Sequence, residues 1–430
     1  MSSWTRRRFL GATGATFAAA PAIIRQARGA AAPNERIRHA VIGTGGQGTN
    51  HCKSFSRVPG CDIVAVCDVD PERRGRAARI LPNPEKVAQY EDYRKILEDS
   101  SINTVSFATP DHWHTPVAMA AILAGKHVYV EKPCSHNVVE AHLLIEAAKK
   151  HNRFVQQGTQ SRSSVDCQEA VKFMRDGGLG KVRMAKAINH QLRKPIGRAP
   201  ESAPPAGVNY DLWLGPAPKH PFTANRWHYN WHWFWDYGCG DAGNDGIHQI
   251  DIARWGLGGG YPKAVIGLGG HLFYDDDHET PDTQTIIYDF GDRQMVFEMR
   301  LWTNYNLEGH DNGNVFYGDK GTLEIGRDGS HVTLLGQERK KLGAGKSPAI
   351  EDHFANFLDA VRANDPSHLN APIAEGAIST ILCHLANIVT RLGCGKIVYD
   401  PTTRTCSGNE AATALLAREY RGGYELPFKG

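Results

Sequence analysis

The sequence predicts an α/β fold with a doubly wound parallel sheet, followed by an α+β domain with an open, mainly antiparallel sheet. Short β-branched apolar runs alternate with longer amphipathic runs over 36–160, and short alternating runs dominate after residue 264. Buried strands that alternate with helices form parallel sheets covered on both faces, whereas alternating runs divided by turns form antiparallel sheets. We therefore expect two domains, 36–160 and 161–430, which suits a chain of 430 residues.

The first domain is expected to hold five strands and the helices between them. The strands fall within 38–48, 61–68, 103–110, 126–133 and 153–160. The clearest helical stretches are 117–125 and 138–151, which are long, apolar on one side and free of proline.

The second domain begins with a Pro-, Gly- and Trp-rich stretch, 194–240, and a helix expected at 245–256. Antiparallel strands are expected within 264–274, 283–290, 294–302, 314–325 and 331–336, and helices near 350–364 and 374–393. Open sheets commonly pack face to face, so we expect a homo-oligomer.

Composition and charge exclude several classes of partner. The net charge is +3, but without the arginines at 6, 7, 8, 25 and 28 there are 44 basic residues against 46 acidic ones, a net of −2. Such a chain has no basic stripe for nucleic acid or for a membrane surface. The nine cysteines form no C-x-x-C pair, so we expect no disulfide framework.

Residues 1–32 have the pattern of an export signal. Arg6, Arg7 and Arg8 precede Phe9 and Leu10, an uncharged run follows, and a small-residue stretch ends before Pro33. Paired arginines before such a run indicate a twin-arginine signal. The run is too short and weakly apolar to be a membrane anchor. We expect the twin-arginine machinery to export the folded protein, so its location would be periplasmic or external.

A glycine-rich turn follows the first strand at 43–48. Gly43, Gly45 and Gly48 have G-x-G-x-x-G spacing, and Gly46 and Gln47 complete the start of the next helix. In this context the glycines make the tight turn, admit a pyrophosphate and let helix and strand pack closely. The alternative is an ordinary glycine-rich turn.

Asp68 stands twenty residues after Gly48, at the end of the second strand. An acid at this place hydrogen-bonds the adenosine ribose and favours NAD over NADP. Arg73 and Arg74 lie close by and would instead suit a 2′-phosphate, so NADP stays possible.

Three stretches of the sequence resemble the Gfo/Idh/MocA oxidoreductases, a family that acts on sugars, inositols and related polyols. They are VIGTGGQG, ATPDHWHTPVAMAAILAGKHVYVEKP at 108–133, and GNDGIHQIDIARWGL at 243–257. The resemblance covers nearly all of the chain after the signal and implies a Rossmann domain that binds NAD(P).

The resemblance also implies roles for individual residues. Lys132 of the Glu131-Lys132-Pro133 motif would contact both nicotinamide ribose and substrate, and would help to move the proton of the hydroxyl. Further cofactor contacts would come from Thr109, Pro110, His114 and Glu131. The alternatives are a surface lysine beside a proline turn and, for His114, a helix cap.

The third stretch resembles the family's Asp-x-Gly-x-His-x-x-Asp helix. His248 would be the acid or base on the substrate hydroxyl. Asn244 stands where aspartate is common, which puts a charged pair with His248 in doubt. Asp245 cannot simply replace it, because one helical step turns a side chain by about 100°. Both residues are nevertheless expected near the substrate, and the alternative for His248 is a satisfied helix histidine.

The aromatic segment 227–238 is interpreted as a sugar-binding subsite. Trp231, Trp233 and Tyr237 offer flat faces that stack on sugar rings. The alternative is a core stripe, since the tryptophans alternate with period two. A metal at His228, His232 and Asp236 is possible by spacing, but the resemblance implies none, and we expect no metal.

Together these features predict an exported NAD(P)-dependent oxidoreductase that acts on a carbohydrate hydroxyl and holds its cofactor tightly. A first alternative is a redox-neutral glycosidase, which oxidises a ring carbon, eliminates the glycosidic substituent, adds water and re-reduces. A second is a non-catalytic sugar-binding or sensing protein, which would need neither Lys132 nor His248.

Overall fold

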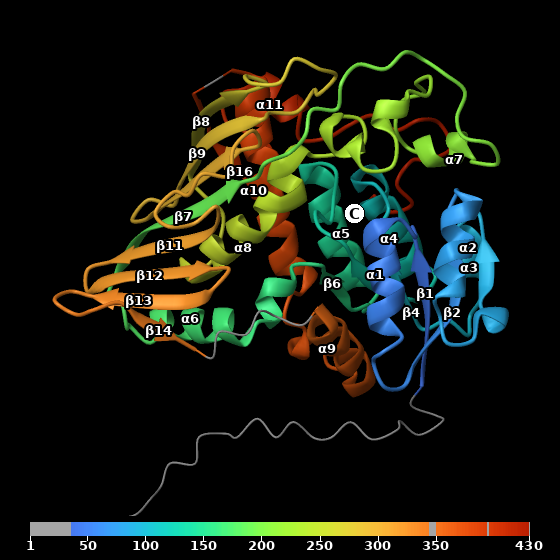
Figure 1. Ribbon diagram of the computed structural model, residues 1–430, viewed down its shortest axis with the longest axis horizontal. Helices are drawn as coiled ribbons and strands as arrows, with labels where there is room; N and C mark the ends of the chain where they lie inside the picture. The colour runs from blue at the N-terminus through green and yellow to red at the C-terminus, as the bar shows by residue number, and fades with distance from the viewer. Residues whose placement is uncertain (1–35, 344–349, 394, 430) are drawn as a thin grey trace, which may run out of the picture.

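The computed structural model describes residues 36–343, 350–393 and 395–429. The expected export signal at 1–32 lies outside the described residues. Two sheets lie side by side, the first formed by residues before 160 and the second mainly by residues after 180 (Figure 1).

The first sheet is parallel throughout, with strand order β3-β2-β1-β4-β5-β6. Its strands are β1 (Ile37–Ile42), β2 (Cys61–Cys67), β3 (Ala88–Tyr90), β4 (Thr104–Phe107), β5 (His127–Val130) and β6 (Val155–Gln157). This confirms the doubly wound parallel sheet, to which β3 adds a short edge strand that the sequence analysis did not predict.

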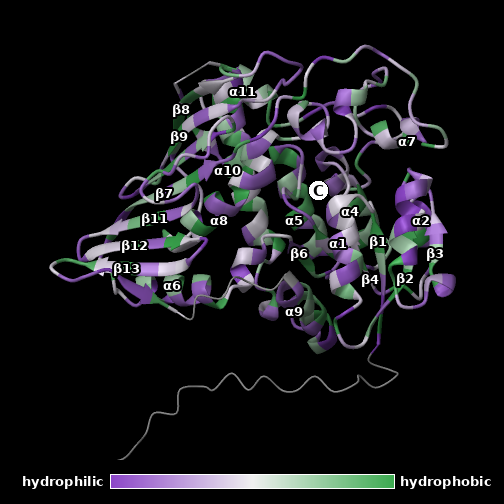
Figure 2. Cartoon of the chain, in the orientation of Figure 1, coloured by the Kyte–Doolittle hydropathy of each residue, from purple (hydrophilic) through white to green (hydrophobic). Residues whose placement is uncertain are grey.

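Helices cover both faces of this sheet. They are α1 (Gly46–Phe55), α2 (Pro71–Arg79), α3 (Arg94–Glu98), α4 (His114–Leu123) and α5 (Val138–Lys150), with short 3₁₀ turns at Pro84–Lys86, Asp111–Trp113 and Gln160–Ser163. Figure 2 shows hydrophobic residues concentrated in the strands, whereas α2 is largely hydrophilic on the outside. Burial of the β-branched strands between helices supplies the core of this domain.

The C-terminal part of the chain returns to this domain. Helix α9 (Ile350–Ala363) packs against α1, and Phe354 lies 4.5 Å from Phe55 and 4.7 Å from Tyr129 between ring centroids. Helix α10 (Ile373–Arg391) packs against α5. The described C-terminal helices therefore complete the Rossmann core.

The second sheet has the order β14-β13-β12-β11-β7-β10-β9-β8-β15. Its strands are β7 (Val182–His190), β8 (Ala264–Gly270), β9 (Thr283–Asp289), β10 (Gln294–Arg300), β11 (Asn312–Gly318), β12 (Gly321–Gly326), β13 (Gly329–Leu334), β14 (Lys340–Leu342) and β15 (Lys396–Ile397). All pairs are antiparallel except β7 with β10, which confirms an open, mainly antiparallel sheet.

Helices cover one face of this second sheet. Helix α8 (Ile247–Gly256) lies against β7 and β11, α10 against β8, and α6 (Val165–Arg175) against β12 and β13. Smaller elements are α7 (Tyr210–Leu214), α11 (Glu410–Ala414), the 3₁₀ turns Ala224–Arg226, Asn230–Trp233 and Pro366–His368, and the hairpin of β16 (Tyr399–Asp400) and β17 (Thr405–Cys406). Among the described helices α10 alone is long and apolar enough to span a membrane, but 78% of its apolar window is buried inside the protein.

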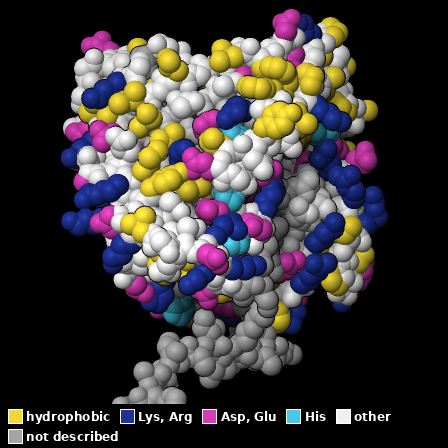
Figure 3. Space-filling model, turned by 60° about the vertical axis from the view of Figure 1, so that its left-hand side comes forward, with side chains coloured by type: hydrophobic (Ala, Val, Ile, Leu, Met, Phe, Trp, Pro, Cys, Tyr) yellow, Lys and Arg dark blue, Asp and Glu magenta, His cyan; other side chains and the backbone are white. Residues whose placement is uncertain are grey.

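None of the described helices covers the opposite face of the second sheet. Leu268 of β8 is 70% exposed, and Leu272 and Phe273 in the loop that follows are 71% and 60% exposed. Figure 3 shows hydrophobic side chains in several groups, with charged ones between them, on the side of the molecule that it turns forward. The expected homo-oligomer stays a prediction, and this face is where it would form.

Candidate active site

A cavity of about 520 Å³ opens at the carboxyl ends of β1, β2, β4 and β5. The first domain contributes the glycine-rich turn, the loop after β4 and the Glu131-Lys132 pair to its wall. The second domain contributes aromatic residues of 227–232 together with Asn244 and His248. Ligands of doubly wound sheets bind at this edge, where the strand order reverses between β1 and β4.

The glycine-rich turn fits a dinucleotide. Gly43 has φ +76°, and a Cβ there would lie 2.8 Å from the amide nitrogen of Thr109. A Cβ on Gly48 would lie only 1.7 Å from the carbonyl oxygen of Gly43, so strand and helix touch at this point. A Cβ on Gly46 would meet nothing within 4 Å. The open space therefore lies at the amino end of α1, where free N–H groups can bind a pyrophosphate.

We expect Gly48→Ala to lower the stability of the fold and Gly46→Ala to lower the retention of NAD. The methyl group of Gly48→Ala collides with backbone and should lower the free energy of unfolding by more than about 3 kcal/mol, measured by denaturant titration. The methyl group of Gly46→Ala enters open space, so stability should change by less than about 1 kcal/mol, while NAD retained after dialysis should fall at least tenfold. Equal loss of stability in both variants would contradict this account of the turn.

Asp68 follows β2 and lies in the wall of the cavity. Its Oδ2 accepts hydrogen bonds from the amide (2.6 Å) and hydroxyl (3.1 Å) of Thr44. Burial raises the pKa of this carboxyl, and the hydrogen bonds from Asp70 and Thr44 oppose that rise. Arg73 also lines the cavity, whereas Arg74 donates to the Asp68 carbonyl oxygen at 2.6 Å. The expected ribose-binding acid is thus in place, with one arginine beside it.

Glu131 is a buried residue of the cavity wall that connects several parts of the site. Its Oε1 accepts hydrogen bonds from Gln47 (2.9 Å) and Gln160 (3.2 Å) and lies 3.0 Å from Nε2 of His51. Burial alone would raise the pKa of Glu131, but the hydrogen bond and charge of His51, followed by Lys132, hold it at about 2. The carboxylate thereby ties the helix of the glycine-rich turn to the loop that presents Lys132.

Lys132 reaches across to the second domain. Its peptide bond to Pro133 is cis. The ammonium group donates to the carbonyl oxygen of Asn244 and lies 3.5 Å from Oδ1 of the same residue. The Asn244 amide in turn donates to Asp241 (2.8 Å) and to the hydroxyl of Tyr229 (3.3 Å). Asn244 therefore positions Lys132, and it does not make the pair with His248 that an aspartate at this place would make.

A π-helical turn at Ala242–Gly246 precedes α8, where the sequence analysis expected regular helix from 245. Asp245 turns away from the cavity wall and accepts hydrogen bonds from Asn312 (3.0 Å) and Gln191. Its expected substrate contact is therefore not supported, because its carboxylate is engaged with the second sheet. Asp251 likewise pairs with the buried Arg162 at 2.7 Å.

His248 lies in the cavity wall, one helical turn from Asn244. Within the described chain, no hydrogen bond holds its ring. Burial lowers its pKa below the ordinary 6.5, and the nearby charge of Lys132 adds to that effect. The imidazole is therefore neutral at pH 7 and free to accept a proton from a ligand.

The loop after β4 brings Thr109, Pro110 and His114 to the cavity. The ring nitrogens of His114 lie 2.6 Å from the carbonyl oxygen of Pro133 and 2.9 Å from that of Thr109. Burial lowers the pKa of His114 to about 4. The histidine connects two loops of the site, and the Thr109 hydroxyl beside it is buried without a hydrogen bond partner.

The aromatic segment is divided between the cavity and the core. Trp231 lines the cavity, and His232 stacks on it at 3.6 Å between ring centroids. Trp233 and Tyr237 lie instead in the core, 2% and 1% exposed. Their interpretation as sugar-stacking residues is therefore corrected, because both side chains are buried among core residues and do not line the cavity.

The histidines and the acid of this segment have separate partners. Asp236 lies 2.8 Å from Nε2 of His220, and the ring of His232 faces the carbonyl oxygen of Tyr229. His228 lies 3.7 Å from Asp70. These contacts do not favour a metal site at His228, His232 and Asp236.

Asp111 is a residue of the cavity wall that sequence reasoning missed. It is 1% exposed, and one of its oxygens accepts a hydrogen bond from the Cys239 amide at 3.1 Å. Burial raises its pKa to about 7, and the charge of Lys132 opposes the rise. The only sequence signal was an acid directly after the Thr-Pro pair that ends a strand.

Comparison with known proteins places the chain in a family. An oxidoreductase family model with an NAD-binding Rossmann fold matches residues 37–159. The model of that family's C-terminal alpha/beta domain matches residues 195–294, so the two cover just over half of the chain. The chain belongs to the Gfo/Idh/MocA family. The resemblance noted in its motifs is thereby confirmed, and its first domain is an NAD-binding domain.

Individual relatives share different parts of the protein. An inositol 2-dehydrogenase of Arthrobacter sp. is 29% identical over 380 residues, which cover 86% of this chain and 98% of that protein. A glycosyl hydrolase family 109 protein of Saccharopolyspora erythraea is 34% identical over 168 residues, only 37% of either chain. The match thus spans little more than a third of the length of that glycosyl hydrolase.

The fold is also that of solved structures. The aldose-aldose oxidoreductase of Caulobacter crescentus superposes with a TM-score of 0.66 at 20% sequence identity, over 84% of this chain and 99% of that one. This likeness shows that the two chains share a fold.

Proposed function

We propose that this protein is an exported oxidoreductase that keeps NAD bound and oxidises a hydroxyl group of a sugar, glycoside or polyol. The observation that carries the proposal is that Lys132 and His248, from different domains, line one cavity with the glycine-rich turn. Bound NAD would accept the two electrons and one proton that leave the hydroxyl-bearing carbon.

The residues of the chain supply the rest of the chemistry. His248, neutral and without a protein partner, takes the proton of the hydroxyl oxygen. Lys132, held by Asn244, donates a hydrogen bond to the same oxygen and stabilises the negative charge that develops there. Trp231 and His232 line the same cavity, where their rings would help to exclude water from the reacting carbon.

Several features support a carbohydrate as substrate. The cavity wall includes Trp213, Trp227, Tyr229 and Trp231, whose faces suit the C–H surface of a sugar ring. The names of the inositol dehydrogenase and of the aldose-aldose oxidoreductase point to polyhydroxylated substrates for those relatives.

Export explains why the cofactor would be held tightly. The arginines at 6–8 favour a route that carries folded proteins, and free NAD is scarce outside the cytoplasm. A cofactor loaded before export must then be regenerated in place, either by a second sugar or ketone or within one catalytic cycle.

A redox-neutral glycosidase is the second candidate, favoured by the similarity to glycosyl hydrolase family 109 proteins over the segment that matches. Oxidation of a ring carbon by the same Lys132 and His248 acidifies the neighbouring C–H bond. Loss of the glycosidic substituent, addition of water and return of the electrons would complete a hydrolysis.

One experiment separates the candidates. Protein without added cofactor is mixed with chromogenic glycosides and with free sugars, and absorbance near 340 nm is followed together with release of the chromophore. Growth of the 340 nm band with a ketone product supports the oxidoreductase, and chromophore release without a lasting change supports the glycosidase. Sugar binding with neither signal would favour the sugar-binding protein and contradict both.

A further inference from the structure

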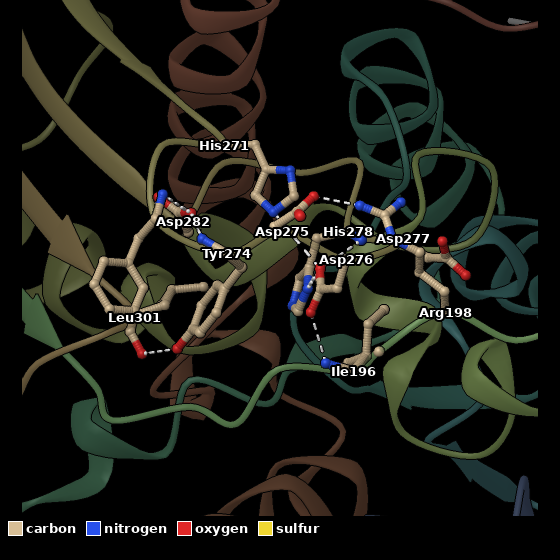
Figure 4. Close-up of polar contacts among 12 residues, drawn as sticks. Ile196, Arg198, His271, Tyr274, Asp275, Asp276, Asp277, His278, Asp282 and Leu301 are labelled. Atoms are coloured by element: carbon tan, nitrogen blue, oxygen red, sulfur yellow. Dashed lines mark hydrogen bonds and ion pairs between the residues drawn. The ribbon is translucent and has the colours of Figure 1, made fainter.

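A group of metal-ligating side chains lies outside the cavity, in the loop between β8 and β9 (Figure 4). His271, Asp276 and His278 each present one donor atom, and these atoms lie within 4.8 Å of one another. No other such group occurs in the part of the chain that the structure describes. The three residues share one loop of the second domain and have no part in the proposed chemistry.

Two imidazole nitrogens of this group have no hydrogen bond partner among the residues that the structure describes. Nε2 of His271 is shielded from solvent, and its nearest acidic oxygen, Oδ1 of Asp276, is 3.6 Å away. Nε2 of His278 is equally shielded, but it lies on the far side of the ring from Nδ1, the nitrogen that faces Asp276 at 2.6 Å. A buried polar atom left without a partner is unfavourable, so the His271 nitrogen that faces the carboxylate lacks an interaction that a bound ion would supply.

The carboxylate and the second ring are held in place by their surroundings. Oδ2 of Asp276 accepts the amide of Ile196 at 2.7 Å, and Oδ1 accepts the amide of His278 at 3.0 Å and lies 2.6 Å from its Nδ1. The His278 ring stacks on Tyr274 at 5.3 Å and lies 5.2 Å from Trp233. Metal ligands are oriented by surrounding contacts of this kind.

We propose that His271, Asp276 and His278 bind one divalent transition-metal ion, with zinc as the ion that fits best. Two imidazoles and one carboxylate, with water in the fourth position, form a tetrahedral zinc site, whereas calcium and magnesium prefer oxygen ligands alone. Ligands at about 2.0–2.2 Å from one ion are at most about 4.4 Å apart. A tetrahedral ion at these distances holds its ligands about 3.3–3.6 Å apart. The 3.6 Å between Nε2 of His271 and Oδ1 of Asp276 already fits, whereas the 2.6 Å between that Oδ1 and Nδ1 of His278 must widen as the ion displaces the proton between them.

The ion would stabilise the loop between β8 and β9, which contacts the aromatic segment 227–238. The amide of Glu279 donates to the Trp233 carbonyl oxygen at 2.9 Å, and its carboxylate accepts the amide of Trp235 at 2.8 Å. Trp231 and His232 of the same segment line the cavity. A metal here thus has a structural role, fixing the side of the cavity that belongs to the second domain.

Metal titration of the purified full-length protein tests this proposal. The protein is freed of metal with a chelator, dialysed, and titrated with Zn²⁺ in competition with a chromophoric indicator and with Co²⁺ while the visible d–d bands are recorded. We expect one ion per chain, cobalt bands of four-coordinate N/O ligation, and a higher melting temperature with zinc. His271→Gln should weaken binding at least tenfold and remove the cobalt bands, while the fold persists because Nε2 of His271 makes no hydrogen bond.

His368→Gln is the matched control. Nε2 of His368 lies 3.5 Å from Oδ2 of Asp365, nearly the same separation as between His271 and Asp276, but no third ligand is close to this pair. This variant should bind the ion as the wild type does. Absence of binding by the wild type, or equal affinity in His271→Gln and His368→Gln, would overturn the proposal. Asp276→Asn should also lose binding. If this variant fails to fold, the comparison of His271→Gln with His368→Gln still tests the proposal.

Discussion

Lys132→Met should lower kcat by about 10²–10⁴-fold while the cofactor content of the protein stays unchanged. Methionine keeps the length and apolar stem of lysine but removes the ammonium group that donates to Asn244 and faces the cavity. The cofactor should remain because the glycine-rich turn and Glu131 are untouched. Turnover on the best sugar or glycoside and NAD(H) released on denaturation are measured on the same preparation.

Lys126→Met is the matched control for this variant. Lys126 lies in the same domain, is 2% exposed, and its ammonium group also donates to a backbone carbonyl oxygen, that of Asp99 at 2.5 Å. It does not line the cavity. We expect a loss of stability with kcat within about threefold of wild type. If both variants lost turnover equally, the role of Lys132 would be structural.

His248→Asn should lower kcat by a similar factor and also change the pH profile. The pKa of His248 in the folded protein is depressed below 6.5 by burial and by the charge of Lys132. The neutral imidazole is the form that accepts the proton, so wild-type turnover should be full above pH 6.5 and fall as pH drops through this lowered pKa. The variant should show low turnover without that acid limb, as measured by kcat from pH 4.5 to 8.

His142→Asn controls for a buried histidine that is merely structural. Burial lowers the pKa of His142 to about 4, and its Nε2 lies 2.6 Å from the Tyr399 hydroxyl, away from the cavity. Its variant should keep both kcat and the acid limb. An acid limb that survives in His248→Asn would show that another group, such as Asp111, sets the pH dependence.

The periodic parts of the fold could be predicted from the sequence. Strands β1, β2, β4 and β5 are short, largely apolar runs, and α9 and α10 lie within a few residues of their expected places. Strand β7 was missed, although it lies in the middle of the second sheet. Its sequence, VRMAKAINH, mixes charged and apolar residues and therefore lacks a clear strand pattern. The neighbouring strands β10 and β11, which pair with it on both sides, fix its place in the sheet.

The site was predictable where a motif sets the backbone and not where tertiary contacts choose a side chain's direction. Gly43 and Lys132 fall in the cavity because their motifs follow strands at the carboxyl edge of the first sheet, and His248 because its motif begins α8. Trp233 and Asp245 were misjudged, because a 3₁₀ turn and a π turn rotate them away from it. Tyr229 and His232 reach the cavity from the second domain, and Asp111 has only a weak local signal, an acid directly after the Thr-Pro pair that ends a strand.

The central claim is that the cofactor is a resident part of this protein, and its direct test is the NAD content of protein purified without added cofactor. The protein is denatured, and the released NAD(H) and NADP(H) are quantified against the chain concentration. We expect close to one NAD(H) per chain, with little NADP(H), because Asp68 lies in the cavity wall after the second strand, where an acid favours NAD over NADP. A chain that emerges empty and binds NAD only weakly when it is supplied would contradict the claim.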